Sequence, residues 1–255
     1  MSFDAYAALV ERADPERFRA AMAAPVAARR VLFPLYAFNV EVARAPWVTE
    51  EPMIAEMRMQ WWRDALEEIA GGGQPRRHEV VDALADVLDD EGARLLDKLV
   101  AARRWDVYKD AFEDAAHFDD YIDATSGHLM WTAARLLGHA DESAVRDFAY
   151  GVGVANLFRA IPDLEERGRK PLVDGSGAAV TALAEKATAR LEAARRQRRS
   201  VSAEAGAALY AGYLGRPVLR QVLKDPGKVA RGALGLPPLA ERVRFLNVAL
   251  RGWWR

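Results

Sequence analysis

The sequence has no cysteine, which excludes disulfide bridges, thiolate metal sites and a cysteine nucleophile. It also has no apolar run close to the ~18 residues that a membrane-spanning helix needs. The first residues, MSFDAYAALVERAD, lack the basic stretch followed by an apolar run that marks a secretory signal. These absences fit a soluble or peripheral protein in a reducing compartment. We expect it in the cytoplasm, with peripheral contact to the inner face of the cell membrane as an open alternative.

Net charge is also nearly absent, because 36 Lys and Arg almost balance 37 Asp and Glu over 255 residues. The two signs are unevenly placed, however. Residues 190–255 have 14 Lys and Arg against 4 Asp and Glu, whereas residues 1–189 have 22 against 33. A basic C-terminal quarter on an acidic body indicates either an anionic surface or acidic partner, or pairing between the two parts of the chain.

Two stretches of the basic region are candidate contact surfaces. One is the arginine cluster in RLEAARRQRRS, and the other is the pair of tryptophans that ends VRFLNVALRGWWR. Tryptophan rings beside arginines suit the headgroup level of a membrane, but they could instead dock the last helix onto the body. The arginine cluster has no interleaved aromatics or recognised motif, so we expect no nucleic acid partner. The candidate surface residues are Arg195, Arg196, Arg198, Arg199, Trp253 and Trp254.

Alternating strand patterns are missing, and nearly every segment has helical spacing. Hydrophobic residues make up 51% of the chain, enough for a substantial core, and no linker marks a domain boundary. The sequence therefore predicts one all-α domain over residues 1–255. We expect helices over 3–12, 14–24, 25–44, 49–70, 77–90, 92–109, 118–137, 141–161, 178–199, 203–223 and 237–255. The expected buried face of the fourth helix consists of Ile54, Met57, Trp61, Ala65, Leu66 and Ile69.

The stretch from Leu35 to Ile69 contains LYAFNVEVARAPW and MRMQWW, and its first part resembles a signature of the squalene/phytoene synthase family. In that family a helix reads roughly YAFCRxxDDxxD. Aspartates four apart share one helical face and hold Mg²⁺ against a diphosphate, since hard cations prefer carboxylate and phosphate oxygens. Here the aromatic half of the motif remains and the aspartates are replaced. The residues at these positions are Tyr36, Phe38, Asn39, Ala43, Arg44 and Trp47.

A second stretch, GVGVANLFRAIPDLEERGR, resembles the family pattern QLTNILRDxxED. Asn156 and Arg159 match the pattern. Ala160 and Leu164 replace its aspartates, and Asp163 fills the glutamate position. A three-metal Mg²⁺ cluster cannot be built from what remains in the two motifs. We therefore predict no catalytic residue and no metal ligand among them.

A third segment, FDDYIDATSG (118–127), resembles the family's LxxYCxxVAG through Tyr121 and Gly127, and Gly168-Arg169 matches the start of its GRxYLP. The resemblance covers roughly residues 25–250. It implies the isoprenoid synthase fold, a single-domain helical bundle around a central apolar cavity.

The pattern of replaced aspartates resembles that of one branch of the family. The motifs that carry this resemblance are AFNVE (37–41), MRMQWW (57–62) and the RAxP that begins at Arg159. That branch consists of assembly factors of respiratory complex I (NADH dehydrogenase) that contain a squalene/phytoene synthase domain. The resemblance implies a catalytically degenerate protein that acts in complex I assembly by binding a protein partner or a membrane. It implies no cofactor.

Two alternatives remain open. One is a Mg²⁺-dependent prenyl transferase, which condenses prenyl diphosphates head to head, with relocated acids such as Asp119, Asp120 and Asp123 facing the cavity. The other is a carrier for an isoprenoid or a quinone. Carboxylates converging at one mouth of the cavity would favour the enzyme, and a cavity filled by side chains would count against the carrier. On the degenerate interpretation we expect Trp47 and its neighbours to fill the former metal site.

Overall fold

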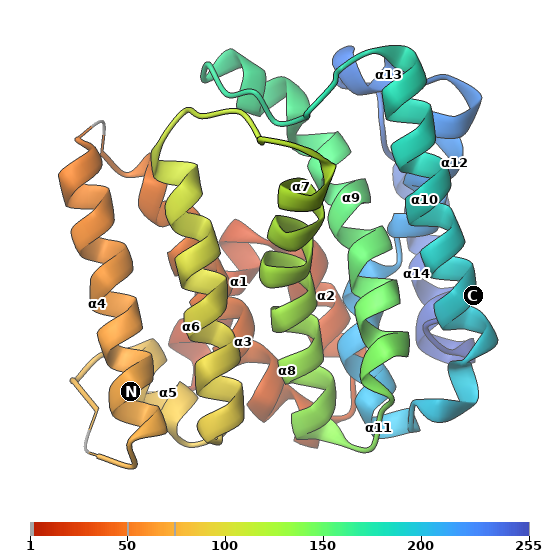
Figure 1. Ribbon diagram of the computed structural model, residues 1–255. Helices are drawn as coiled ribbons and strands as arrows, with labels where there is room; N and C mark the ends of the chain where they lie inside the picture. The colour runs from red at the N-terminus through yellow and green to blue at the C-terminus, as the bar shows by residue number, and fades with distance from the viewer. Residues whose placement is uncertain (1–2, 50, 74, 255) are drawn as a thin grey trace.

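The computed structural model describes residues 3–49, 51–73 and 75–254, and its regular elements are helices (Figure 1). Within those residues the one β-type contact is an isolated bridge between Ala140 and Val201. The all-α prediction is therefore confirmed. The α-helices are α1 (Phe3–Ala13), α2 (Pro15–Ala23), α3 (Val26–Arg44), α4 (Pro52–Ala70), α5 (Glu79–Ala85), α6 (Asp90–Arg103), α7 (Ala115–Ile122), α8 (His128–Leu137), α9 (Glu142–Glu166), α10 (Gly177–Arg196), α11 (Ala203–Gly206), α12 (Gly215–Lys224), α13 (Gly227–Ala230) and α14 (Pro238–Arg251). Shorter turns are η1 (Ala45–Trp47), η2 (Arg104–Val107), η3 (Asp123–Gly127), η4 (Arg198–Ser200) and η5 (Ala207–Gly212).

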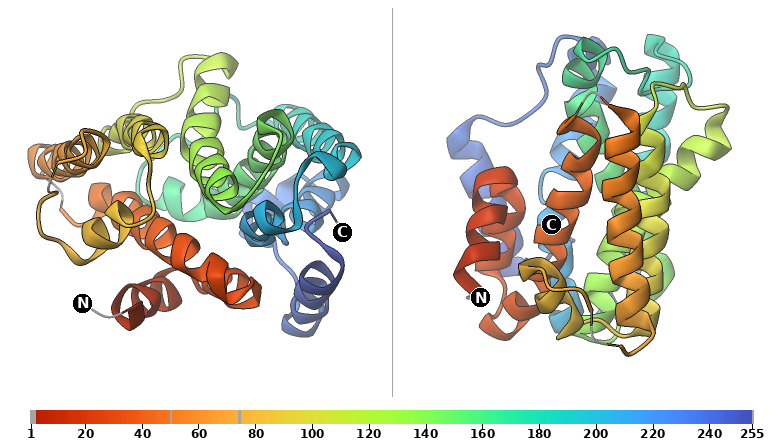
Figure 2. Two further views of the ribbon diagram at one scale, coloured as in Figure 1. Left: turned by 90° about the horizontal axis from the view of Figure 1, so that it is seen from below. Right: turned by 90° about the vertical axis from the view of Figure 1, so that its left-hand side faces the viewer.

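The long helices form two layers. Helices α4, α6, α8, α9 and α10 stand roughly parallel in a row, and α1 to α3 lie behind them (Figure 1). The view from below shows α1 and α3 on one side of this row, with α12 and α14 near its α10 end (Figure 2). Contacts between α4 and α6 and between α9 and α10 run along the row, and contacts between α3 and α8 join the two layers.

Helix α3 is the most buried element of the back layer. Its residues Leu32, Phe33, Leu35 and Phe38 are fully shielded from solvent. Phe38 meets Trp62 of α4 edge to face, with ring centroids 5.3 Å apart, a favourable geometry for aromatic pairs. This packing fixes α3 against the row of long helices. It thereby fixes the direction in which the first-motif residues point.

The buried face of α4 differs from the predicted one. Ala55, Met59 and Trp62 are buried with Ala65, Leu66 and Ile69, whereas Ile54 and Met57 are 46% and 66% exposed. Apolar residues are adjacent in this helix, as in Trp61-Trp62, so two neighbouring stripes satisfy the same three- and four-residue spacing. Packing against α6 and α3, and not periodicity, selects between them.

A single π-helical turn, η3, interrupts the helix predicted over 118–137. It lies against α9, where Ser126 Oγ donates a 2.8 Å hydrogen bond to the carbonyl of Ala149. A Cβ atom at Gly153 of α9 would lie 2.8 Å from Cβ of Ser126, so glycine is needed for this approach. The close contact holds η3 and α9 together along one wall of the site described below.

The helix predicted over 203–223 is also broken, into α11, η5 and α12. The break lies where the chain passes close to α9. A Cβ atom at Gly212 would come within 2.5 Å of the ring of Phe148, so the main chain occupies space that side chains fill elsewhere. None of the helices in the described residues has both the length and the apolarity to cross a membrane.

Candidate functional site

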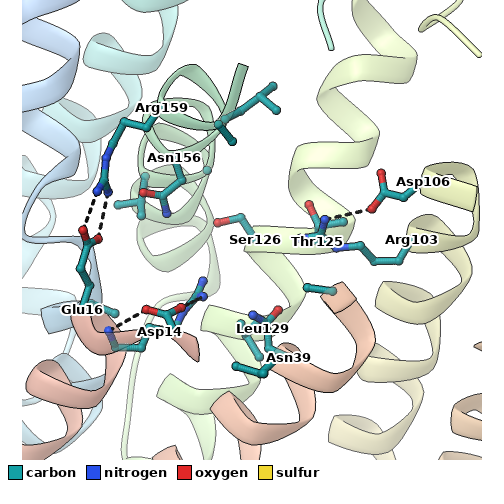
Figure 3. A pocket seen from close by; sticks show the side chains of 18 of the residues that line it. Asp14, Glu16, Asn39, Arg103, Asp106, Thr125, Ser126, Leu129, Asn156 and Arg159 are labelled. Carbon is teal, nitrogen blue, oxygen red and sulfur yellow. Dashed lines mark hydrogen bonds and ion pairs between the residues drawn. The ribbon is translucent and has the colours of Figure 1, made fainter. Parts of the chain in front are cut away.

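A cavity of about 1280 Å³ lies between α1, α2, α3, η3 and α9. Its inner wall is largely apolar and includes Ile122, Leu129, Met130 and Val152. Its rim carries charged side chains (Figure 3). Protein interiors normally contain few voids larger than a water molecule, so a cleft of this size has the dimensions of a ligand pocket.

The structure brings the two predicted motifs together in this cavity. From the first motif, all but one of the six residues line it, namely Tyr36, Asn39, Ala43, Arg44 and Trp47. Phe38 is instead buried against Trp62. From the second motif, the lining residues are Asn156, Arg159, Ala160 and Leu164, whereas Asp163 is exposed on α9 and is not among them.

The expectation that Trp47 and its neighbours fill the former metal site is wrong, because the cavity is open and Trp47 is part of its wall. The guanidinium groups of Arg167 and Arg169 each lie 4.9 Å from the centroid of the Trp47 ring. Cations at this distance over an indole face are attracted by the ring quadrupole. These two arginines hold the ring at the rim.

Among the described residues, three carboxylates line the cavity, and each is held by an arginine. Asp14 caps α2 by accepting from the main-chain nitrogen of Arg17 at 3.0 Å, and it also pairs with the guanidinium of Arg17 at 2.5 Å. In Figure 3 Asp14 lies beside a second ion pair, in which Glu16 of α2 accepts 2.9 and 2.5 Å hydrogen bonds from Arg159 of α9. The hydrogen bond to Glu16 raises the pKa of Arg159.

The third carboxylate, Asp106, belongs to a buried network. It pairs with Arg103 at 3.0 Å and accepts a 2.8 Å hydrogen bond from the hydroxyl of Tyr121. Burial raises the pKa of Tyr121 far above its ordinary value, so the phenol stays protonated and donates to Asp106. Burial does the same at Tyr36, whose hydroxyl points to the carbonyl of Ala208 at 3.5 Å.

The acids considered as relocated metal ligands do not face the cavity. Asp119 accepts a 2.6 Å hydrogen bond from Tyr150 and pairs with Lys186, and Asp123 accepts a 2.8 Å bond from Arg146. Asp120 is exposed. The expectation for this trio is therefore wrong, because α7 and η3 turn other side chains toward the cavity. Over the part of the chain that the structure describes, no three His, Asp or Glu side chains are placed to hold a metal ion.

The candidate contact surface is only partly exposed. Arg196, Arg198 and Arg199 are exposed at the end of α10 and in η4, and Arg195 lies 3.6 Å from Glu192. Trp253 is 3% exposed and meets Phe148 of α9 at 5.0 Å, so it docks the end of the chain onto the body. Trp254 is half-buried beside it, with the two ring centroids 6.0 Å apart.

Several residues of the site were not predicted from the sequence. Asp14, Glu16, Arg17, Arg103 and Asp106 all lie outside the motif stretches. One signal was present for the first of them, because Asp14-Pro15 marks the start of α2. No local pattern indicated that this helix start would face a cavity.

Comparison with known proteins places this geometry in a family. The squalene/phytoene synthase family model matches residues 10–172. The chain is 31% identical over 175 residues to a complex I assembly factor 6 homolog of Drosophila melanogaster, a match that covers 65% of this chain and 52% of the relative. It is 27% identical over 159 residues to complex I assembly factor 6 of Homo sapiens, covering 60% and 47%. The chain thus spans about half the length of these curated relatives.

Solved structures share the fold. A dehydrosqualene synthase has a TM-score of 0.75 at 13% identity, with 96% of this chain and 94% of that chain covered. Squalene synthase HpnC from Alicyclobacillus acidocaldarius has a TM-score of 0.70 at 16% identity, with 92% and 95% covered. These likenesses confirm the predicted fold, and the family match confirms the resemblance carried by the motifs. The chain belongs to the squalene/phytoene synthase family.

Proposed function

We propose that this protein is a non-catalytic member of its family that acts in the assembly of respiratory complex I (NADH dehydrogenase) by binding. The observation that carries the proposal is the chemistry of the cavity rim. Arg44 and Trp47 stand where the family has metal-binding aspartates, and the acids that do line the cavity are paired with arginines. The names of the two relatives above supply the process.

The charge at the rim opposes the family's reaction. Drawing a diphosphate away from a prenyl chain requires several Mg²⁺ ions close together, and each ion requires carboxylate ligands. To serve as ligands here, Asp14, Glu16 or Asp106 would have to leave its arginine. Loss of one charged group that stabilises a transition state usually costs several kcal/mol. With nearly all of these charged groups absent, nothing stabilises the departure of diphosphate from the prenyl chain.

For the binding surface we propose the outer face of α14. Leu239, Val243, Leu246 and Leu250 are spaced 4, 3 and 4 residues apart and are 74%, 59%, 56% and 81% exposed. They therefore form one apolar stripe facing away from the body.

Cations flank this stripe. Arg242 and Arg251 are exposed on α14, while the helix's single acid, Glu241, is turned inward to Arg19 at 2.5 Å and Tyr213 at 2.7 Å. An apolar stripe with cations beside it fits an anionic lipid surface, where rings and alkyl groups enter the headgroup region and arginines meet phosphates. We propose peripheral contact with the inner face of the cell membrane through this helix.

Deletion of the gene tests the assembly role. A strain without it should contain partly assembled complex I and have reduced NADH dehydrogenase activity, and the intact gene should restore both. Complex I of normal amount and activity in the deletion strain would overturn the proposal.

A second assay tests the absence of catalysis. The purified protein, incubated with Mg²⁺ and farnesyl or geranylgeranyl diphosphate, should release no diphosphate above background. Turnover at an enzymatic rate would restore the prenyl transferase alternative.

A further inference from the structure

Four arginines gather where α10, α12 and α14 meet, at one end of the row of long helices (Figure 1). Arg216 and Arg220 lie one turn apart on α12, so their side chains share a face of that helix. Arg244 of α14 reaches the start of α12, where its Nε donates a 3.0 Å hydrogen bond to the carbonyl of Tyr213. Arg195 of α10 is close enough to repel Arg216. Three separate helices thus bring cations to one place.

Glu192 of α10 offsets part of this charge. Its carboxylate lies 2.8 Å from Arg216 and 3.6 Å from Arg195, so two cations share it. Burial, followed by the charge of Arg220, still lowers the pKa of Arg216. Burial, followed by the charges of Arg216 and Arg220, also lowers the pKa of Arg244. An additional anion at the cluster would relieve this repulsion between partly buried cations.

The cluster lies beside the apolar stripe of α14. Successive residues of an α-helix are turned by about 100°, so Arg244 and Arg242 lie on opposite flanks of the stripe residue Val243. Phe245 packs on Tyr213 with ring centroids 5.2 Å apart, which turns the Arg244 flank toward α12. A membrane that takes up the stripe therefore places its headgroups next to the cluster.

We propose that Arg216, Arg220 and Arg244 bind the head of a membrane phospholipid that ends in a phosphate monoester. Such a head has close to two negative charges and three terminal oxygens. A phosphodiester head has one charge. Guanidinium groups pair with phosphate oxygens through parallel hydrogen bonds, so neighbouring arginines favour the head with more charge and more free oxygens. The site rests on the peripheral membrane contact proposed above, and it names the lipid that α14 meets.

Binding of the full chain to vesicles tests the proposal. One set of vesicles contains phosphatidylcholine with phosphatidic acid, a phosphate monoester. The other contains phosphatidylcholine with phosphatidylglycerol, a phosphodiester, in the amount that gives the same zeta potential. Equal surface potential separates recognition of the head from the general attraction of a basic surface. We expect cosedimentation to be at least fivefold stronger with phosphatidic acid.

Substitutions locate the head. Arg216→Gln and Arg220→Gln should each lower the preference for phosphatidic acid about threefold or more, because each removes a charged hydrogen bond to the phosphate. Arg242→Gln is the matched control, since it removes the same charge from an exposed position on the opposite flank of α14. It should weaken binding to both kinds of vesicle by the same factor. If Arg216→Gln fails to fold, the exposed Arg220 decides alone.

Equal binding to the two kinds of vesicle, or a preference that the cluster substitutions leave unchanged, would overturn this site and leave the membrane contact of α14 standing. Binding to neither kind would overturn the membrane contact and the site together, and would point to an acidic protein as the partner of the cluster. The assembly role is tested separately, because the vesicle assay does not depend on complex I.

Discussion

Glu16 and Arg159 join α2 to α9 at the mouth of the cavity (Figure 3). Their side chains are 25% and 30% exposed, and two hydrogen bonds connect them. Removing one partner of a partly shielded ion pair lowers the free energy of unfolding more than removing one partner of a surface pair, because the remaining charge is left without its counter-ion. The pair therefore contributes to stability as well as to the charge of the rim.

Replacing Glu16 by glutamine should lower the free energy of unfolding by about 1–3 kcal/mol, measured by urea denaturation. The exposed pair Arg94–Asp90, 3.7 Å apart and 70% and 66% exposed, provides the comparison. Arg94→Gln should change the free energy by less than about 0.5 kcal/mol. Equal effects of the two substitutions would contradict the special position of Glu16.

The hydrogen-bond partner of His128 defines the protonation state of its ring. Its Nδ1 lies 3.2 Å from Nη1 of Arg146, and a guanidinium only donates, so Nδ1 accepts and the ring is neutral. Burial, followed by the charge of Arg146, lowers the pKa of His128 from 6.5 to about 4. Protonation would therefore break this contact.

Between pH 6.5 and about 4 the unfolded chain binds a proton at His128 that the folded chain does not. Stability should therefore fall as the pH is lowered through this window, with at most about 1.4 kcal/mol per pH unit from this group. His128→Gln keeps an acceptor for Arg146 and should flatten the profile, as measured by urea denaturation at several pH values. A variant with the wild-type slope would refute this role.

At the scale of elements, apolar spacing and caps are sufficient to predict most helices. Helices α2, α10 and α14 lie close to their predicted ranges, and Asp14 caps the start of α2. The buried face of α4, the turn η3 and the breaks around η5 were not predictable. Each depends on contacts with a separate helix, α9 or α6, and local sequence does not determine such contacts.

Helix α14 is the element that we propose contacts an anionic membrane surface. Leu246→Gln and Leu250→Gln should each weaken binding to vesicles that contain anionic phospholipid by about five- to tenfold, since each removes an inserted apolar side chain. The measurement is cosedimentation with anionic and with neutral vesicles. Val173→Gln, at a 47% exposed residue in the loop before α10, is the control. Binding that resists both α14 substitutions, or that is equal for neutral vesicles, would show that a protein or another face makes the contact.

At the scale of the whole molecule, the motifs predicted which residues lie together in the site. They did not predict the shape of the cavity or the ion pairs around it. Asn39, Arg44, Asn156 and Arg159 line one cavity, as their resemblance to family positions implies. The openness of the cavity was not predictable, because the position of Trp47 depends on arginines more than a hundred residues away. The ion pair between Glu16 and Arg159 likewise requires α2 to pack on α9.

One apolar core extends from Val10 in α1 to Trp253 at the end of the chain. This continuity predicts that the two halves unfold together, as one domain. Thermal unfolding followed by far-ultraviolet and by near-ultraviolet circular dichroism should give coincident transitions. Two separated transitions would contradict a single cooperative unit.

Helix α14 is fastened differently from the rest of this core. Of its residues, all of which are described, only Val248 is fully buried. Its main-chain hydrogen bonds can therefore open while the remainder of the bundle stays closed. Amide protons of α14 should exchange with deuterium much faster than those of α3 or α9, so the last helix can rearrange on a surface without unfolding the body that carries it.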